Sequence, residues 1–103
     1  MTRPIHRAAE GDLAAASRYH LVEAGKAVAG RFLNELDRVA RLIEAHPGLG
    51  IATSDGRRAC PLRAFPYSLI YREVEGGIQI LIIRHQSRTP AYGQGRTWVA
   101  PQG

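Results

Sequence analysis

The hydrophobic pattern of this chain changes its period at Pro47, and that change restricts the folds it can adopt. After Pro47, Tyr67–Val74 and residues 78–84 are rich in β-branched and aromatic residues, which is typical of β-strands. The Glu75-Gly76-Gly77 segment between them indicates a hairpin. Before Pro47, apolar residues recur every three or four positions, as on one face of a helix, at Val28, Phe32, Leu36, Val39 and Ile43. Helices followed by strands predict an α+β fold.

Caps, stops and turn residues place the remaining elements. Residues 3–7 are expected to form an edge strand, and Asp12 can cap a first helix that Gly25 ends. Residues 48–56 are predicted to be a loop, and residues 58–62 a further strand. The predicted order is therefore β-α-α-β-β-β. The two helices should pack as an antiparallel hairpin on one face of a three- to four-stranded antiparallel sheet.

The last predicted strand is apolar on both of its faces. Its side chains alternate between the two faces, and Gln79 is the one polar residue between Ile78 and Ile83. We expect such a strand to be central, with the helices covering one face. The stripe of Phe32, Leu36, Val39 and Ile43 should be buried there. A partner protein is a candidate cover for the other face.

Length and composition are typical of one small domain. The 103 residues predict a single domain over 1–103, with 90–103 as a C-terminal tail because apolar periodicity ends before it. No apolar run approaches the ~20 residues that a membrane span needs, and residues 1–7 lack the apolar core of a signal peptide. The single cysteine, Cys60, cannot form an internal disulfide. We therefore expect a cytoplasmic protein.

The positive charge is concentrated in the C-terminal half of the chain. Residues 1–56 are neutral overall, whereas residues 57–103 contain seven arginines and only Glu73 and Glu75 as acids. This imbalance accounts for the whole net charge of +5. A basic half beside a neutral half predicts an acidic partner, a nucleic acid, or both. The arginines are Arg57, Arg58, Arg63, Arg72, Arg84, Arg88 and Arg96.

Few residues form a recognisable catalytic pattern. The four histidines are too widely spaced to predict a metal site, and no phosphate-binding loop or nucleophile motif is present, so we expect no metal and no cofactor. One arrangement remains for a metal-independent ribonuclease. His85 would act as acid or base, Arg84 and Arg88 would contact the phosphate, and Tyr92 would stack on a base. A single histidine provides only one such group, so binding of an acidic protein is the competing interpretation.

Several segments together resemble the RelE/ParE toxin superfamily of type II toxin–antitoxin systems. The resemblance covers about residues 5–90 and implies a helical hairpin on an antiparallel sheet. It also implies a toxin that is neutralised by a small antitoxin encoded beside it. The segments are Ala9-Glu10-Gly11-Asp12-Leu13, Phe32-Leu33-Asn34-Glu35-Leu36, His46-Pro47-Gly48-Leu49-Gly50, the run from Arg63 through Pro66-Tyr67 to Tyr71-Arg72, and residues 80–85 followed by Arg88.

The superfamily divides by target, and this chain is more similar to ParE. RelE-like members cut messenger RNA on the ribosome with several lysines and arginines and a C-terminal tyrosine or histidine. ParE-like members inhibit DNA gyrase without that catalytic set. The only lysine here, Lys26, lies on the predicted helical hairpin. The resemblance therefore implies a gyrase inhibitor with a ParD-like antitoxin and no catalytic residues. A ribosome-dependent endoribonuclease and a non-toxic interaction module are the alternatives.

The basic half is the expected binding surface for the antitoxin or the target. An acidic, partly disordered antitoxin segment should fold onto the sheet, bury Leu81 or Ile83, and pair with several arginines. Tyr92 and Trp98 are candidate anchors in the tail. The complete predicted set is Arg57, Arg58, Arg63, Arg72, Leu81, Ile83, Arg84, Arg88, Tyr92, Arg96 and Trp98.

Overall fold

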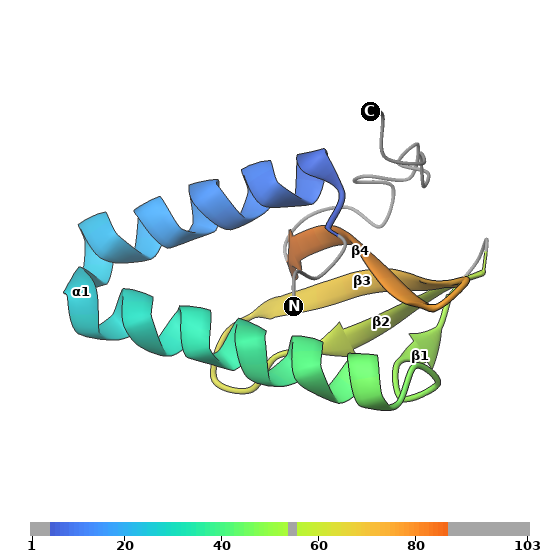
Figure 1. The fold of residues 1–103 in the computed structure, drawn as a ribbon. Helices are drawn as coiled ribbons and strands as arrows, with labels where there is room; N and C mark the ends of the chain where they lie inside the picture. The colour runs from blue at the N-terminus through green and yellow to red at the C-terminus, as the bar shows by residue number, and fades with distance from the viewer. Residues whose placement is uncertain (1–4, 54–55, 87–103) are drawn as a thin grey trace.

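The computed structural model describes residues 5–53 and 56–86. One long, bent helix packs on an antiparallel sheet of four strands in the order β1-β2-β3-β4 (Figure 1). This arrangement confirms the α+β class and the antiparallel sheet. The predicted tail, residues 90–103, lies outside the described residues. The elements are α1 (Arg7–Ala45), β1 (Ile51–Ala52), β2 (Arg57–Pro61), β3 (Tyr67–Val74) and β4 (Gly77–His85).

The helical region is one bent helix where the sequence predicts two. Its bend is at Gly25, whose φ of 88° and ψ of 175° lie outside the helical region, so the predicted stop coincides with the bend. A positive φ is readily adopted only by glycine, which has no Cβ to clash. The two halves double back on each other beside the sheet (Figure 1). The predicted hairpin of two separate helices is therefore not confirmed as such.

The helix begins earlier than Asp12, which was the wrong choice of cap. His6 is the N-cap, and its Nδ1 accepts a hydrogen bond from the Ala8 N–H at 3.1 Å. Asp12 lies inside the helix, where its carboxylate accepts a hydrogen bond from the backbone N–H of Ile83 at 3.1 Å. A residue that looks like a cap in the sequence therefore joins α1 to β4.

Two further predictions of strands need correction. Residues 3 and 4 of the predicted N-terminal edge strand lie outside the described residues. Its described part is helical from Arg7, and Ile5 forms an isolated parallel bridge with Ile80, supported by a 2.8 Å bond from the His6 N–H to the Ile80 carbonyl. Conversely, the predicted loop 48–56 contains the two-residue strand β1, which pairs with β2. Strand β2 covers Arg57–Pro61, one residue earlier than expected. The hairpin turn is confirmed, since Val74 pairs with Gly77 across Glu75-Gly76.

Within the described residues, β4 is the last strand of the sheet. It pairs with β3 on one side, and on the other side it makes only the isolated Ile5–Ile80 bridge, so the prediction that it is central is wrong. It is nevertheless buried on both faces. Ile78, Ile80 and Ile83 belong to the core beneath α1, whereas Leu81 and Ile82 belong to a second cluster on the opposite face. A register shift between Ile70 and Tyr71 inserts an extra residue into β4 and turns two neighbouring side chains to the same face.

The main core lies between α1 and the sheet, as the helical stripe predicts. The stripe residues Phe32, Leu36, Val39 and Ile43 are at most 7% exposed and pack with Leu69, Tyr71 and Ile80. Burying each large apolar side chain stabilises the fold by roughly 1.5–3 kcal/mol. Within the described ranges, no helix is long and apolar enough to span a membrane.

Candidate functional site

The two faces of the sheet differ in what covers them. We call the face that packs against α1 the inner face and the opposite one the outer face (Figure 1). Opposed residues of neighbouring strands share a face. Because Arg57 pairs with Arg72 and Arg72 pairs with Gln79, these three residues form one row across β2, β3 and β4. Gln79 lies between two inner-face isoleucines, so this row, which we call the outer row, is on the outer face.

The outer row contains polar groups with little access to water. Arg57 is 9% exposed and Gln79 is 6% exposed, while Arg72 between them is half-buried. The Gln79 Oε1 atom is buried and has no hydrogen-bond partner in the described structure. No hydrogen bond or ion pair joins the Arg72 side chain to any residue that the structure describes. Buried polar groups are normally paired, so the Gln79 oxygen is unusual among the described residues.

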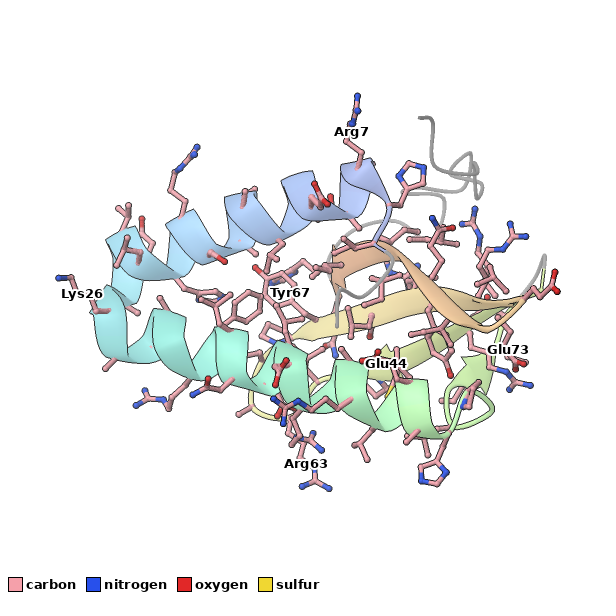
Figure 2. All side chains as sticks on the ribbon, in the orientation of Figure 1. Arg7, Lys26, Glu44, Arg63, Tyr67 and Glu73 are labelled. Carbon is pink, nitrogen blue, oxygen red and sulfur yellow. The ribbon has the colours of Figure 1, made fainter. Side chains whose placement is uncertain are left out.

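The predicted arginines do not form one cluster. Arg57, Arg72 and Arg84 share the outer face, where Arg84 lies opposite Ser68. Arg58 is on the inner face, and its Nη1 donates to the Gly50 carbonyl at 3.0 Å while its Nε lies 3.7 Å from Glu73. Arg63 is exposed on the loop between β2 and β3, beside the second half of α1 (Figure 2).

The ribonuclease arrangement is split between the two faces. His85 is on the inner face, where its ring contacts Tyr67 edge-on at a centroid distance of 5.0 Å. Arg84, its neighbour in β4, points to the outer face. The other predicted residues of the C-terminal segment, Arg88, Tyr92, Arg96 and Trp98, lie outside the described residues. The described part of the chain therefore does not bring His85 and an arginine of β4 to one phosphate.

Two predicted antitoxin contacts, Leu81 and Ile83, are buried in this structure, with exposures of 0% and 5%. Ile83 nevertheless borders an apolar hollow of about 260 Å³ between α1 and β4. Leu33, which is 45% exposed, forms part of its rim. The hollow is lined by Ile5, Leu13, Leu33, Leu36, Asp37, Ala40, Leu69, Ile80 and Ile83. Its lining suits aliphatic side chains.

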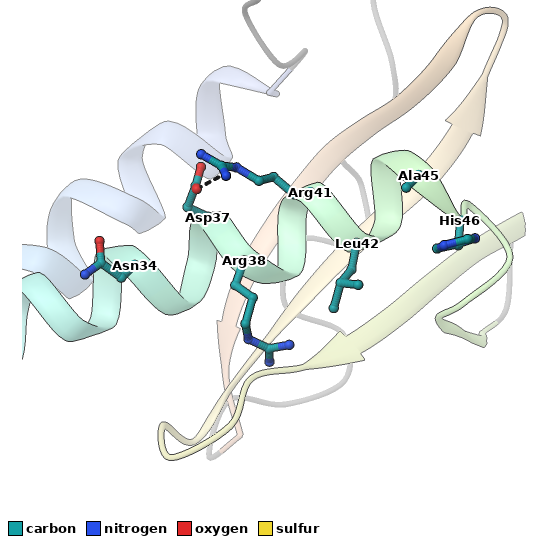
Figure 3. Close-up of a pocket in the computed structure, with 7 residues that line it drawn as sticks. All are labelled: Asn34, Asp37, Arg38, Arg41, Leu42, Ala45 and His46. Atoms are coloured by element: carbon teal, nitrogen blue, oxygen red, sulfur yellow. Dashed lines mark ion pairs between the residues drawn. The ribbon is translucent and has the colours of Figure 1, made fainter.

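A second, more open hollow of about 520 Å³ lies on the second half of α1 (Figure 3). It is lined by Asn34, Asp37, Arg38, Arg41, Leu42, Ala45 and His46. Its charged side chains already have intramolecular partners, since Arg41 Nε lies 2.9 Å from Asp37 and Arg38 binds Glu35. Figure 3 shows Arg41 turned toward Asp37 while Arg38 and Leu42 point away from it. The residues do not converge on one ligand position.

Glu35 fixes the loop that carries Arg63, a contact that the sequence did not predict. Its carboxylate accepts hydrogen bonds from Arg38 Nε and Nη2 at 2.7 and 2.8 Å, and from the backbone N–H of Arg63. The hydrogen bonds from Arg38, followed by that from Arg63, lower the pKa of Glu35. The loop also contains Ala64 at a φ of 64°, an unfavourable value for a residue with a Cβ. In the sequence, only the Glu35–Arg38 part of this contact could be predicted, because residues three apart lie on the same face of a helix.

Tyr71 holds the segment before β1 against the sheet. Its hydroxyl accepts from the Gly50 N–H at 2.9 Å and donates to the Pro47 carbonyl at 2.6 Å. Burial raises the pKa of this hydroxyl, so it stays protonated and able to donate. A Cβ at position 50 would come within 2.8 Å of the Tyr71 ring, so only glycine fits without movement. This network explains why the predicted loop runs along β2.

The described residues contain few groups that could carry out catalysis. Burial raises the pKa of the Cys60 thiol, which disfavours the nucleophilic thiolate. Within residues 5–53 and 56–86, no three histidine, cysteine or acidic side chains gather into a metal site. What the sheet does offer is a set of arginines and an apolar hollow, which are features of binding surfaces.

Comparisons with known proteins give a consistent result. A family model described as "ParE toxin of type II toxin-antitoxin system, parDE" matches residues 5–90. The solved structure "Chromosomal ParDE TA system from P. aeruginosa" is similar with a TM-score of 0.70 and 26% sequence identity. That match covers 82% of this chain and 95% of the other chain. No curated protein sequence is similar enough to count as a match.

Proposed function

This chain belongs to the ParE toxin family of type II toxin–antitoxin systems, and we propose that it inhibits DNA gyrase when it is not bound to a ParD-like antitoxin. The family match over residues 5–90 is the observation that carries the proposal. The similar structure comes from a ParDE toxin–antitoxin system, which supports an antitoxin as the binding partner. The arginines and the apolar hollow supply the chemistry for binding such a partner.

The antitoxin would use two kinds of contact on this chain. Aliphatic side chains of an amphipathic antitoxin segment would enter the hollow beside Leu33 and Ile83. Acidic side chains of the same protein would pair with exposed or half-buried arginines, among which Arg63, Arg72 and Arg84 have no side-chain ion pair within the described structure. A segment that folds on binding can reach both regions, because it wraps around its partner.

Inhibition of gyrase without covalent chemistry is the activity that agrees best with the site. A ribosome-dependent endoribonuclease needs an acid–base group and cations at one phosphate. Here His85 and Arg84 point to opposite faces of β4. An inhibitor needs only a complementary surface, which a basic sheet with exposed arginines can provide. The assignment of gyrase as the target comes from the family.

Expression of the chain without its partner tests the function. We expect growth arrest with filamentation and DNA breaks, together with inhibition of gyrase supercoiling by the purified protein. His85→Ala should leave this inhibition unchanged. Rapid cleavage of messenger RNA that His85→Ala abolishes would instead identify an endoribonuclease. Normal growth, with gyrase unaffected, would leave a non-toxic interaction module.

Co-expression with the neighbouring reading frame tests the antitoxin. We expect a complex that co-purifies and restores growth. Leu33→Glu should weaken the complex, because it places a charge at the rim of the apolar hollow. The matched control is Leu49→Glu, since Leu49 is 51% exposed but does not line the hollow. Equal weakening by both variants would contradict the proposed use of the hollow.

A further inference from the structure

We infer that Ala40 is a specificity-determining residue, because its small side chain keeps open the apolar hollow between α1 and β4 for one aliphatic side chain of the antitoxin. This role rests on the proposed function, which supplies the antitoxin as the partner. It extends the proposed function to the residue that decides whether a partner side chain fits, and to the chemical class of that side chain.

Among the described residues that line the hollow, Ala40 is the only small one. The rest of the lining consists of seven large aliphatic side chains and Asp37. Ala40 follows Leu36 by four residues and precedes Ile43 by three, so the three residues lie on the helix face that packs on the sheet. Ala40 is only 4% exposed, and the helical period predicts a large apolar residue at such a position. The hollow is therefore the space that a larger residue at position 40 would occupy.

This unfilled space is unfavourable for the free chain. The hollow has a volume of about 260 Å³, and side chains that line an empty apolar space lack dispersion contacts on one side. Empty volume in a core lowers stability roughly in proportion to its size. A leucine at position 40 would fill part of the hollow without burying a polar group. A site at which stability is given up in this way is typical of a binding site.

The volume and the lining define the side chain that fits. An apolar cavity of about 150 Å³ already holds a benzene molecule, so this hollow has room for one large side chain. Its walls are aliphatic on each element that forms them, with Leu13 from the first half of α1, Leu36 from the second half and Ile80 from β4. A charged or amide side chain would lose its hydration there without gaining a partner. Leucine, isoleucine and methionine are the side chains that suit the hollow.

The rim of the hollow adds a charge that matches an acidic antitoxin. Asp37 belongs to the lining and lies 2.9 Å from Arg41 Nε, a pair that Figure 3 shows on the second half of α1. The Arg41 side chain is 74% exposed, so its other N–H groups remain accessible to a partner. A segment with an aliphatic residue in the hollow can place a neighbouring acidic residue beside Arg41. The net charge of +5 also favours an acidic segment over a second copy of this basic chain.

The first test fills the hollow with Ala40→Leu. We expect the Tm of the free chain to rise by about 2–8 °C, because the added isopropyl group occupies empty space. Affinity for the purified product of the neighbouring reading frame, measured by calorimetry, should fall about tenfold to a hundredfold, because the partner's aliphatic side chain is excluded. The matched control is Ala27→Leu, the same change at an exposed position of α1, which should leave both quantities almost unchanged.

A compensating variant separates the size of the hollow from general damage to the fold. Leu13→Ala removes volume from the wall that the first half of α1 forms. The double variant Leu13→Ala/Ala40→Leu should therefore recover most of the affinity that Ala40→Leu loses. Equal affinity of Ala40→Leu and the native chain would overturn the inference, as would a loss of affinity that the double variant does not recover. A lower Tm for Ala40→Leu would overturn it too, because the space beside Ala40 would not be free.

Xenon, which enters apolar cavities, probes the hollow without any antitoxin. Under xenon pressure, the methyl resonances of Leu33 and Ile83 should shift in the native chain and stay in place in Ala40→Leu. Absence of this shift in the native chain would overturn the inference.

The same set of measurements distinguishes failure of the inference from failure of the proposed function. A native chain that binds the antitoxin through the hollow but does not inhibit gyrase would retain the role of Ala40 and reject only the target. A native chain that does not bind the product of the neighbouring reading frame would reject the antitoxin as partner, and the role of Ala40 with it. A native chain that inhibits gyrase and binds the antitoxin as tightly as Ala40→Leu would reject the role of Ala40 alone.

Discussion

The inner and outer faces of the sheet use polar side chains in different ways. On the inner face, the Tyr71 hydroxyl binds Gly50 and Pro47, and Arg58 binds the Gly50 carbonyl, so polar groups join the loops to the core. On the outer face, Gln79 is buried with an unpaired amide oxygen, and Arg72 has no ion pair with a described residue. The comparison suggests a division of roles, in which the inner face stabilises the fold and the outer face binds a partner.

The largest expected effect is on the inner face, from Phe32→Ala. Phe32 is fully buried, and its ring contacts His20 and Tyr67 at centroid distances of 4.6 and 5.0 Å. Removing it should lower the free energy of unfolding by about 3–5 kcal/mol, measured by urea denaturation. The neighbouring variant Leu33→Ala should cost far less, because Leu33 is half-exposed. Similar losses for the two variants would show that the core is not where we place it.

The next largest effect on stability is expected at the contact between Tyr71 of the inner face and Gly50, which precedes β1. Gly50→Ala puts a Cβ within 2.8 Å of Tyr71, so the segment before β1 must shift. We expect a loss of about 1–3 kcal/mol in the free energy of unfolding, measured in the same way. Gly48→Ala is the control, because a Cβ there meets no atom within 4 Å. If both glycines tolerate alanine equally, Tyr71 does not fix this segment.

A smaller effect is the pH dependence that Glu35 contributes. Its pKa is lowered in the folded state, so its bonds to Arg38 and Arg63 stabilise the fold above the ordinary glutamate pKa of about 4.3. This contribution is lost as pH falls through the lowered pKa. Glu35→Gln should cost no more than about 1 kcal/mol at neutral pH, since Arg38 is partly exposed and water screens the pair.

The measurement is urea denaturation of both proteins between pH 7 and pH 2. The stability difference between the native chain and Glu35→Gln should shrink as the solution becomes acidic. A difference that stays constant over this range would show that the ionised carboxylate is not what holds the Arg63 loop. The variant Asp37→Asn serves as a control on the exposed face of the same helix, where the Arg41 ion pair should contribute little.

The local hydrophobic pattern of the sequence is enough to predict which elements and side chains form much of the inner face. The Tyr67–Val74 strand, the Glu75-Gly76 turn and the burial of Phe32 follow from periodicity and from glycine, which act over a few residues. The wrong predictions concern position in the sheet. The place of β4 at the end of the sheet and the pairing of β1 depend on contacts between distant residues, such as Tyr71 with Gly50. Local periodicity does not specify such contacts.

The candidate site was less predictable than the fold. The excess of arginines in the second half of the chain was evident, but their division between faces depends on strand register. Arg57 and Arg58 are neighbours in sequence yet lie on opposite faces, because side chains alternate along β2. In the sequence, Gln79 is only an interruption of an apolar run. Its position opposite Arg72 depends on the register of β3 and β4, which the sequence pattern does not specify.

The division of roles between the faces is tested most directly by one paired measurement. Affinity for the antitoxin and thermal unfolding of the free chain are compared for Arg72→Gln on the outer face and Arg58→Gln on the inner face. We predict that Arg72→Gln weakens antitoxin binding about tenfold without lowering the Tm, whereas Arg58→Gln lowers the Tm and leaves affinity within twofold. The reverse pattern, with Arg72 needed for stability and Arg58 for binding, would contradict the account.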